Sequence, residues 1–578
     1  MIGGATRGAG RAGAVRIARD QLVHAVRALW RTQVVLIFTF AMPLLWLLVV
    51  GLLAGNDAVG EDGVRVMQFA APTAIAMGTF YATLPPVAIS VAEARESGVL
   101  KRLRGTPLPG WCYFFGQIGA ALLFALGSLV VTVLLAVLLY EVRLRPETLL
   151  AAAVTLVLGG MAFSAVGLAI GSLSPSASIA EAASIGAAVV LSFISGLFFV
   201  GGALPAWLDD VASVFPLKPY ADSLQDQFNP FLPGNGWHPA NLAVIAAWLL
   251  AGTLVSLHAF RWEGSRATGA PRRPFRAPSS AGSSVGSSAG PSAGPSAGSS
   301  AGSSVGSSVG PSAGPSPGGS RTSEVRRPSA LALLERQAGA ALRGTARRPG
   351  DVFFSVVLPV GLFALMVTVQ PGDTTADGRP AVLAIGASMV TWGAGVAMFM
   401  NLSEGVARAR DSGQLKRMRG TPLTAVEYLA GRTVAGFTLT VVILAAILLL
   451  GAVAYGLRIG PAGLLLGLVV LLLGAVCLAA CGFLLATLVP NARAVGTVGL
   501  AILFLLSFFS DVFLNDGPEW MGTVGSLFPL KHLQNGLVAA WDTAGAEVPW
   551  PDLLVLAVWA AAAGSLAARR FRWEPVTA

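Results

Sequence analysis

The run VVLIFTFAMPLLWLLVVGLLAG (residues 34–55) carries no charged side chain, and TLTVVILAAILLLGAVAYG (residues 438–456) repeats this pattern late in the chain. The hydrocarbon core of a bilayer is about 30 Å thick, and about 20 helical residues are needed to cross it. Because lipid offers backbone groups no hydrogen-bond partner, each such run must be helical. These runs predict an all-α polytopic membrane protein.

The composition of the whole chain agrees with this prediction. Of 578 residues, 54% are hydrophobic and 12% charged, whereas a soluble domain has about 25% charged residues. Each half contains six apolar segments, which predicts about 12 spans in two six-helix bundles. They are 33–54, 67–92, 113–140, 148–173, 180–201 and 241–260, then 351–370, 380–402, 427–456, 461–488, 494–515 and 549–568. The second segment of each half is rich in Gly and Pro, which suits close helix packing.

The two halves carry the same short motifs. ESGVLKRLRGTPL (residues 96–108) returns as DSGQLKRMRGTPL (residues 411–423), with ten of thirteen positions identical. FPLK begins at Phe215 and again at Phe528, and FRWE begins at Phe260 and again at Phe571. Repeats at a nearly constant offset indicate an internal duplication. The only four lysines of the chain all fall in these motifs: Lys101, Lys218, Lys416 and Lys531.

The segment between the halves has a different composition. It consists of Ser, Gly, Ala and Pro without an apolar period, which predicts a disordered linker. We therefore expect a first unit at residues 1–263, a linker at 264–327 and a second unit at 328–578. About 60 such residues reach roughly 40 Å, enough to join two bundles without dictating their packing.

The basic residues predict the orientation in the membrane. With the Arg-rich segment before the first span inside, most of the 39 Lys and Arg residues fall on the cytoplasmic side. An even number of spans per half then places the N-terminus, the linker and the C-terminus in the cytoplasm. The two units are accordingly expected to be parallel repeats.

The repeated basic loop follows the second span of each half. Residues 96–104 can form about two helical turns, with Leu100 on an apolar face and Lys101 on another. The Gly-Thr-Pro sequence then ends the helix, because a residue before proline disfavours the helical conformation. A purely electrostatic membrane anchor would explain the charge but not the retained sequence. We expect a short helix that docks on a partner protein.

Each unit resembles the permease subunit of ABC-2 type exporters. The resemblance rests on six spans, an acid-x-Gly-x-Leu-basic-x-x-x-x-Thr-Pro-Leu loop after the second, and a long external segment before the last. It covers nearly everything except the linker, as in two such permeases fused in tandem. In that family the loop is a coupling helix docking on a separate ATP-binding subunit, here expected in two copies. The resemblance assigns this role to Glu96, Gly98, Leu100, Lys101, Thr106, Pro107, Asp411, Gly413, Leu415, Lys416, Thr421 and Pro422.

The two copies depart from the family pattern at one position. In the family, a second acidic residue is common three positions before the acid that opens the loop motif. Glu93 fits this pattern in the first copy, but the second copy has Arg408 at the equivalent position. Docking need not be equal in the two units. The resemblance also implies an outer helix after each FPLK motif that closes the exit, although an interfacial helix without gating fits equally. It further implies amphipathic helices at residues 15–31 and 330–347.

The sequence lacks its own energy source. The ATP-binding motif G-x-x-x-x-G-K-[ST] occurs nowhere, so we expect this chain to bind no cofactor and ATP and Mg to sit on the partner. No catalytic constellation is apparent, and three cysteines and four histidines show no disulfide or metal-site spacing. An ion-coupled secondary transporter of the 6+6 type is an alternative, although its spans usually need acidic residues or His. A non-transporting membrane scaffold is another.

The cargo is left open by the sequence. Spans with few charges favour an apolar or amphipathic small molecule, and a drug-like or antibiotic-like cargo leaving through a bacterial cell membrane is the family-level expectation. Membrane lipid is the other expected contact, and nucleic acid is not expected. Six phenylalanines are candidates for the cargo path, although simple helix packing also explains them: Phe193, Phe198, Phe199, Phe504, Phe508 and Phe509.

Overall fold

The computed structural model describes two helical units. It covers residues 5–31, 36–53, 58–59, 64–106, 110–198, 205–232, 234–260, 330–346, 348–369, 374, 378–420, 424–513, 519–542, 545 and 547–571. We call the part before residue 261 the first unit and the part from residue 330 the second unit. The predicted linker at 264–327 lies outside the described residues.

The first unit begins with a helix that precedes the spans, and its fifth span is followed by two shorter helices. Its helices and strands are α1 (Ala5–Trp30), η1 (Ile37–Ala41), α3 (Met42–Leu53), β1 (Ala58–Val59), β2 (Val64–Arg65), α4 (Met67–Glu96), α5 (Val99–Arg104), α6 (Gly110–Tyr140), η2 (Pro146–Thr148), α7 (Leu149–Leu173), α8 (Ala177–Ile194), α9 (Ala206–Ser213), α10 (Leu217–Phe228) and α11 (Pro239–Ala259).

The second unit repeats this order. Its elements are α12 (Ala330–Ala346), α13 (Pro349–Val352), η3 (Phe353–Val357), α14 (Leu358–Val369), α15 (Ala381–Ala394), η4 (Gly395–Asn401), α16 (Leu402–Asp411), α17 (Gln414–Arg419), α18 (Ala425–Tyr455), α19 (Pro461–Leu488), α20 (Ala492–Phe509), α21 (Glu519–Gly525), α22 (Pro529–Trp541) and α23 (Trp550–Arg570). Helices α15, η4 and α16 form one continuous second span.

The predicted helical membrane architecture is confirmed. Among the described residues, ten helices are long and apolar enough to cross a membrane. Two shorter apolar helices, Thr39–Leu52 and Ala494–Phe509, occupy the two remaining span positions. The second spans end later than expected, at Glu96 and Asp411 rather than at residues 92 and 402. Their charged ends therefore reach beyond the apolar segment that the sequence shows.

A small hairpin interrupts the all-α pattern. Strands β1 and β2 pair antiparallel, with Ala58 opposite Arg65 and Val59 opposite Val64. In the second unit only an isolated bridge is described in this region, between Thr374 and Pro380. Both lie between the first and second spans, so the hairpin shapes a loop and leaves the helical fold unchanged.

The second span is the centre of each unit. Within its most apolar stretch, 89% of α4 is buried, and for residues 381–411 the figure is 94%. Such burial requires close approach by neighbouring helices, which small residues allow. At Gly167 of α7 an added Cβ would lie 2.5 Å from the Leu84 carbonyl oxygen. At the equivalent Gly482 of α19 it would lie 2.7 Å from the Phe399 carbonyl oxygen.

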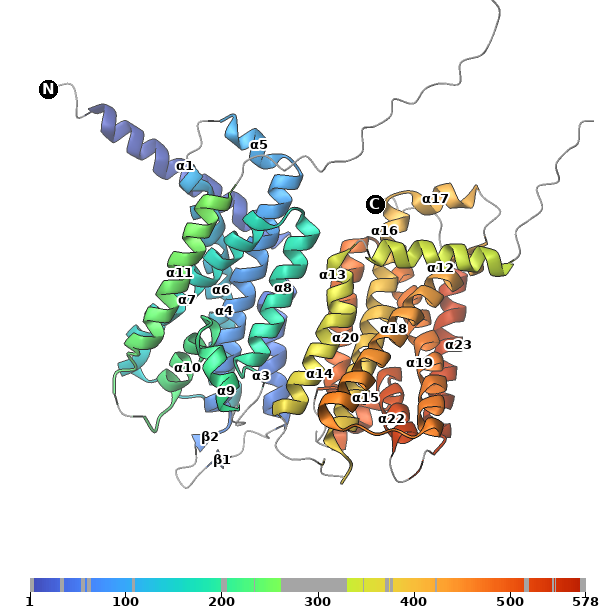
Figure 1. Cartoon of the computed structure of the whole chain (residues 1–578). Helices are drawn as coiled ribbons and strands as arrows, with labels where there is room; N and C mark the ends of the chain where they lie inside the picture. The colour runs from blue at the N-terminus through green and yellow to red at the C-terminus, as the bar shows by residue number, and fades with distance from the viewer. Residues whose placement is uncertain are drawn as a thin grey trace, which may run out of the picture. The chain divides into compact units, whose positions relative to one another are not determined.

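The two ends of each unit carry different elements (Figure 1). In the first unit α1 and α5 lie at one end of the spans, and α9 and α10 lie towards the other. In the second unit α12 and α17 lie at one end and α22 towards the other. The helices expected at residues 15–31 and 330–347 are therefore present as α1 and α12, at the end that bears the repeated basic loop.

Replacing the glycine at either close approach should disrupt packing at the centre of its unit. Gly167→Ala and Gly482→Ala bring a methyl group against backbone carbonyls that cannot move aside, and such overpacking costs about 1–3 kcal/mol. Thermal unfolding of the full chain in detergent should show a lower midpoint for each variant. Gly361→Ala in α14 is the matched control, because no atom lies within 4 Å of its added Cβ. A control that unfolds as early as Gly482→Ala would contradict this account.

Candidate functional site

A left-handed glycine separates the second span from the repeated basic helix. Gly98 has φ of 74° and Gly413 has φ of 68°, a conformation that costs other residues energy. The chain turns there, and α5 and α17 begin directly afterwards. The expectation of one continuous helix from Glu96 to Arg104 is therefore wrong: Glu96 ends α4, and α5 covers only Val99–Arg104.

Hydrogen bonds close the far end of α5. The Thr106 amide and hydroxyl both donate to the Leu103 carbonyl oxygen, at 3.0 and 2.6 Å. The Gly105 amide donates to the Arg102 carbonyl oxygen at 3.1 Å. In the second copy the Gly420 amide makes the equivalent bond to Arg417 at 3.3 Å. The other predicted stop residues, Pro107, Thr421 and Pro422, lie outside the described residues.

The apolar face of each short helix packs against its own unit. Leu100 and Leu415 are both 0% exposed. Leu100 packs with side chains such as Val91 and Tyr113, and Leu415 packs with the equivalent residues of α16 and α18. Burying a leucine contributes about 1.5–3 kcal/mol. The two leucines hold the helices in place within their own units, and their role in docking on a partner stays a prediction.

The opposite face of each short helix is basic and exposed. Lys101 and Arg102 project from α5, and Lys416 and Arg417 project from α17. Arg104 and Arg419 are exposed in the last turns of the same helices. Burial of one face thus fixes which charges face outward, and the arrangement is the same in both units.

An Arg–acid pair anchors the end of the second span in the first unit. The Arg95 guanidinium donates to the carbonyl oxygen of Ser172 at 2.9 Å and to that of Ser174, at the end of α7. A Glu96 carboxylate oxygen accepts from the Ala177 amide at 2.8 Å, at the start of α8. Cations are favourable at helix C-termini and anions at N-termini. The pair therefore satisfies backbone groups on both sides of one connection.

The second unit contains the same arrangement. Asp411 accepts from the Ala492 amide at 2.7 Å, at the start of α20. Arg410, only 5% exposed, donates to carbonyl oxygens at the end of α19: Ala486 (2.7 Å), Val489 (3.0 Å) and Pro490 (2.8 Å). We call each Arg–acid pair with its bonded backbone groups the clamp of its unit. The clamp joins the end of span two to the connection between spans four and five.

The clamp gives two predicted residues a structural contact and adds two that the sequence reasoning missed. Glu96 and Asp411 bond backbone amides of their own unit and so fix the short helix, while their role in docking stays a prediction. Arg95 and Arg410 lie just outside the quoted repeat. Their signal was an Arg directly before the acid in both copies.

The two units differ one helical turn before the clamp. Glu93 is exposed on α4, whereas Arg408 on α16 forms an ion pair with Glu404. Arg348 lies 3.8 Å from Asp351 at the start of the neighbouring first span. The second unit therefore has a charged network on its own spans where the first presents an exposed acid. This is a physical basis for unequal docking, which stays a prediction.

The outer helix packs into the bundle of its unit. Leu217, Tyr220 and Leu224 of α10 are all 0% exposed. The Lys218 ammonium lies 3.0 Å from an Asp209 oxygen and 3.1 Å from one of Asp222. Burial alone would lower the pKa of Lys218, but the two carboxylates outweigh it and raise that pKa. The equivalent Lys531 pairs with Asp511 at 2.6 Å, so both FPLK lysines hold the outer segment by charge.

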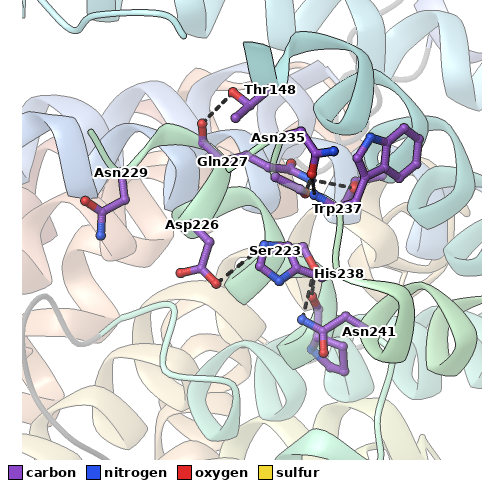
Figure 2. Close-up of polar contacts among 12 residues, drawn as sticks. Thr148, Ser223, Asp226, Gln227, Asn229, Asn235, Trp237, His238 and Asn241 are labelled. Atoms are coloured by element: carbon purple, nitrogen blue, oxygen red, sulfur yellow. Dashed lines mark hydrogen bonds and ion pairs between the residues drawn. The ribbon is translucent and has the colours of Figure 1, made fainter. Parts of the chain in front are cut away.

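Polar contacts fasten the end of α10 to the chain that leads into α11 (Figure 2). The Gln227 side-chain amide donates to the Gly236 carbonyl oxygen at 2.9 Å, and the Gln227 backbone carbonyl oxygen accepts from the Thr148 hydroxyl at 2.8 Å. Asp226 points toward His238, with 3.6 Å between the Asp226 Oδ2 and His238 Nε2 atoms. The helix is thus tied at its end as well as along its buried face. This favours the packed outer helix over one lying on the membrane surface, while an exit-closing role stays a prediction.

The candidate phenylalanines form aromatic clusters with two tryptophans that the sequence reasoning did not single out. In the first unit Phe193 and Phe198 have centroids 4.3 Å apart, and Trp46 meets Phe198 edge-on at 5.6 Å. In the second unit Phe504 lies 5.1 Å from Phe508, and Trp392 lies 4.9 Å from Phe513. Phe509 instead packs against Trp520 at 6.1 Å, and Phe199 lies outside the described residues.

The tryptophans give these clusters a polar element. The indole N–H groups of Trp46 and Trp392 are buried and make no hydrogen bond in the described structure. An unpaired buried donor costs free energy, so an acceptor atom brought there would be stabilised. Among the described residues, no group of three or more His, Cys, Asp or Glu side chains is placed to hold a metal ion.

Comparison with known proteins matches this architecture. Residues 22–228 match the family described as "ABC-2 type transporter", and residues 373–569 match that described as "ABC-2 family transporter protein". The chain is 28% identical over 157 residues to the "Probable multidrug ABC transporter permease YbhR" of Escherichia coli (strain K12), and equally to that of Escherichia coli O157:H7. This alignment covers 27% of the chain and 42% of those relatives.

The two family matches together span more than two thirds of the chain, with one match in each unit. Each includes the second span, the short basic helix and most of the spans that follow. The chain is a multi-pass membrane protein that belongs to the ABC-2 type transporter family, with two ABC-2 permease units in tandem.

Proposed function

We propose that the chain is the transmembrane part of an ATP-driven exporter and that α5 and α17 dock on separate ATPase subunits, one per unit. Each unit, at residues 1–263 and 328–578, would supply one half of the cargo pathway, with the intervening segment as a tether. ATP and Mg would be bound by the partner. The basic ends would face the cytoplasm of a bacterial cell.

The observation that carries this proposal is the rigid presentation of the same basic face twice. Each short helix is held by a buried leucine, a left-handed glycine and the clamp beside it. A membrane anchor needs positive charge only, and it needs none of these restraints. A partner that must transmit force needs all of them, because a loose helix would move without its unit.

The clamp suggests how movement at the short helix reaches the pathway. A displacement of α5 would act on the end of α4, and through Arg95 and Glu96 on the ends of α7 and α8. These helices lead toward the first unit's aromatic cluster on α8. ATP-bound and ATP-free partners would thus favour different arrangements of the unit, as a ligand biases a two-state equilibrium.

The aromatic clusters support an apolar or amphipathic cargo. They offer ring faces and two buried indole donors, which suit a drug-like or antibiotic-like molecule with an acceptor oxygen. The printed name of the Escherichia coli relatives, a probable multidrug permease, points the same way. Packing alone also accounts for the rings. A substitution at Trp392 that weakens cargo binding while the unit stays folded would separate these roles.

An ion-coupled transporter remains the second candidate, because Glu404, Arg408 and Asp351 form a partly buried charged network in the second unit. The network lies at span ends instead of along a path through them, which favours a structural role. Export that continues after ATP depletion, while the ion gradient is kept, would favour this alternative.

Reversing the charge of the exposed face should prevent docking. The paired changes Lys101→Glu with Arg102→Glu, and Lys416→Glu with Arg417→Glu, leave the buried leucines untouched. We expect ATP hydrolysis that copurifies with the chain from its native cells to fall about tenfold or more, as for lost interfacial charge pairs. Cargo efflux should fall with it.

The matched control reverses two exposed charges on α1, Arg16→Glu with Arg19→Glu, at the same end of the first unit. It should retain both activities. If the variant altered in both units copurifies and exports like the wild type, the basic faces are anchors only and the docking proposal fails.

Weakening the clamp should affect coupling more than docking. Asp411→Ala removes the acceptor for the α20 amide, a loss of about 1 kcal/mol, whereas Asp411→Asn keeps an acceptor oxygen. We expect Asp411→Ala to retain the copurifying ATPase but to lower the stimulation of hydrolysis by cargo several-fold. Asp411→Asn should stay near the wild type. Equal behaviour of the two variants would show that the clamp plays no part in coupling.

The orientation can be tested with single introduced cysteines. Asn235 is exposed in the chain before α11, and Arg102 is exposed on α5. An impermeant maleimide applied to intact cells should label Asn235→Cys but not Arg102→Cys, and both after lysis. The unmodified chain, with Cys112 and Cys477 buried, gives the background. Labelling of Arg102→Cys in intact cells would invert the proposed topology.

A further inference from the structure

A cleft of about 490 Å³ opens beneath α17 in the second unit. Its wall includes Leu415 of α17, Thr487 of α19 and Phe571 after α23. Three arginines from two helices also line it: Arg410 of α16, and Arg569 and Arg570 of α23. Small-molecule sites commonly have volumes of about 300–1,000 Å³. The cleft is therefore large enough to hold a ligand.

The charge of the cleft is strongly positive. None of the described residues that line it is acidic. The nearby Asp411 already accepts from the Ala492 amide and lies 3.5 Å from the Arg410 Nε atom. The Arg410 guanidinium already donates to backbone carbonyl oxygens. Its contribution to ligand binding is therefore its positive charge. Arg569 and Arg570 are exposed and can supply the donors.

The cleft lies where three spans end. The second, fourth and sixth spans of the unit finish at Asp411, Leu488 and Arg570. This is the level at which a bilayer changes from hydrocarbon to headgroups. The remaining lining is apolar and includes Val406 and Leu488. An apolar wall beside arginines at that depth matches a lipid with an anionic headgroup better than a soluble anion.

The first unit is built differently at the equivalent place. The two residues directly before the repeated FRWE motif are His258 and Ala259 in the first unit and Arg569 and Arg570 in the second. There the Phe260 ring packs 4.9 Å from that of Phe114, whose counterpart in the second unit is Leu429. The second unit thus combines a smaller side chain with two more positive charges. The cleft is therefore a feature of the second unit, and the overall positive charge of the chain does not account for it.

We propose that this cleft is a binding site for a phosphate group, carried by the headgroup of an anionic phospholipid, and that it is specific to the second unit. Guanidinium groups bind phosphate oxygens through charge-assisted hydrogen bonds. Arg569 and Arg570 bind the phosphate, and the Arg410 charge makes the electrostatic potential of the cleft more positive. The acyl chains lie along the apolar wall. Because Leu415 contributes to the wall of the same cleft, the bound lipid lies close to α17.

The test titrates the purified full chain in neutral detergent with phosphatidylglycerol and counts bound lipids by native mass spectrometry. Each arginine near an anionic phosphate changes affinity about fivefold, so Arg569→Gln with Arg570→Gln should weaken the tightest site roughly 30-fold. Both side chains are exposed, and an unchanged unfolding midpoint without lipid checks that the variant is folded. The matched control, Arg16→Gln with Arg19→Gln on α1, removes the same charge and should bind like the wild type.

A second arm replaces the lipid by inorganic phosphate and follows the unfolding midpoint. Stabilisation by phosphatidylglycerol without stabilisation by inorganic phosphate supports the lipid source. Stabilisation by both, lost in Arg569→Gln with Arg570→Gln, supports the phosphate site and overturns its restriction to lipid. Lipid affinity within twofold of the wild type in that variant, or equal loss in the α1 control, overturns the site. No step requires the ATPase, so failure here is distinct from failure of the docking proposal.

Discussion

Unpaired backbone groups at helix ends are the constraint on which each unit depends. Where α7 ends and α8 begins, carbonyl and amide groups lack partners within their own helices. The Arg–acid pair at the end of the second span satisfies both sets at once. The same solution appears at α19 and α20. Local hydrogen bonding therefore sets the direction in which each second span ends, and with it the position of the short basic helix.

Much of the fold was predictable because length and hydrophobicity determine spans almost alone. The duplicated motifs and the short basic helix also followed from local patterns, whereas the position of the helices before the spans came from the resemblance to ABC-2 permeases. The inward direction of Leu100 and the bonding of Glu96 did not follow, since the face that a six-residue helix buries depends on neighbouring helices. Cleft residues such as Arg410 and Arg570 come from distant segments, and no sequence period relates them.

The duplication has preserved the frame of each unit and changed its surfaces. Gly167 and Gly482 keep the same close approach, and the two clamps keep the same bonds. In contrast, exposed Glu93 of the first unit corresponds to Arg408 in the second, and half-buried Phe114 corresponds to Leu429. Positions inside a close-packed bundle tolerate few volumes, whereas exposed positions are free to acquire separate properties. A fused pair can therefore become asymmetric in its contacts while both units keep one architecture.

The scarcity of lysine has a practical consequence for chemical mapping of assemblies. Of the four lysines, Lys101 and Lys416 are exposed on the short basic helices, while the side chains of Lys218 and Lys531 are only 17% and 13% exposed and are paired with carboxylates. An amine-reactive cross-linker applied to the folded chain would thus react with side chains mainly at two points, one at the equivalent position of each unit. The lysine cross-linked to any captured protein would then identify α5 or α17 as the helix that this protein contacts, without an engineered label.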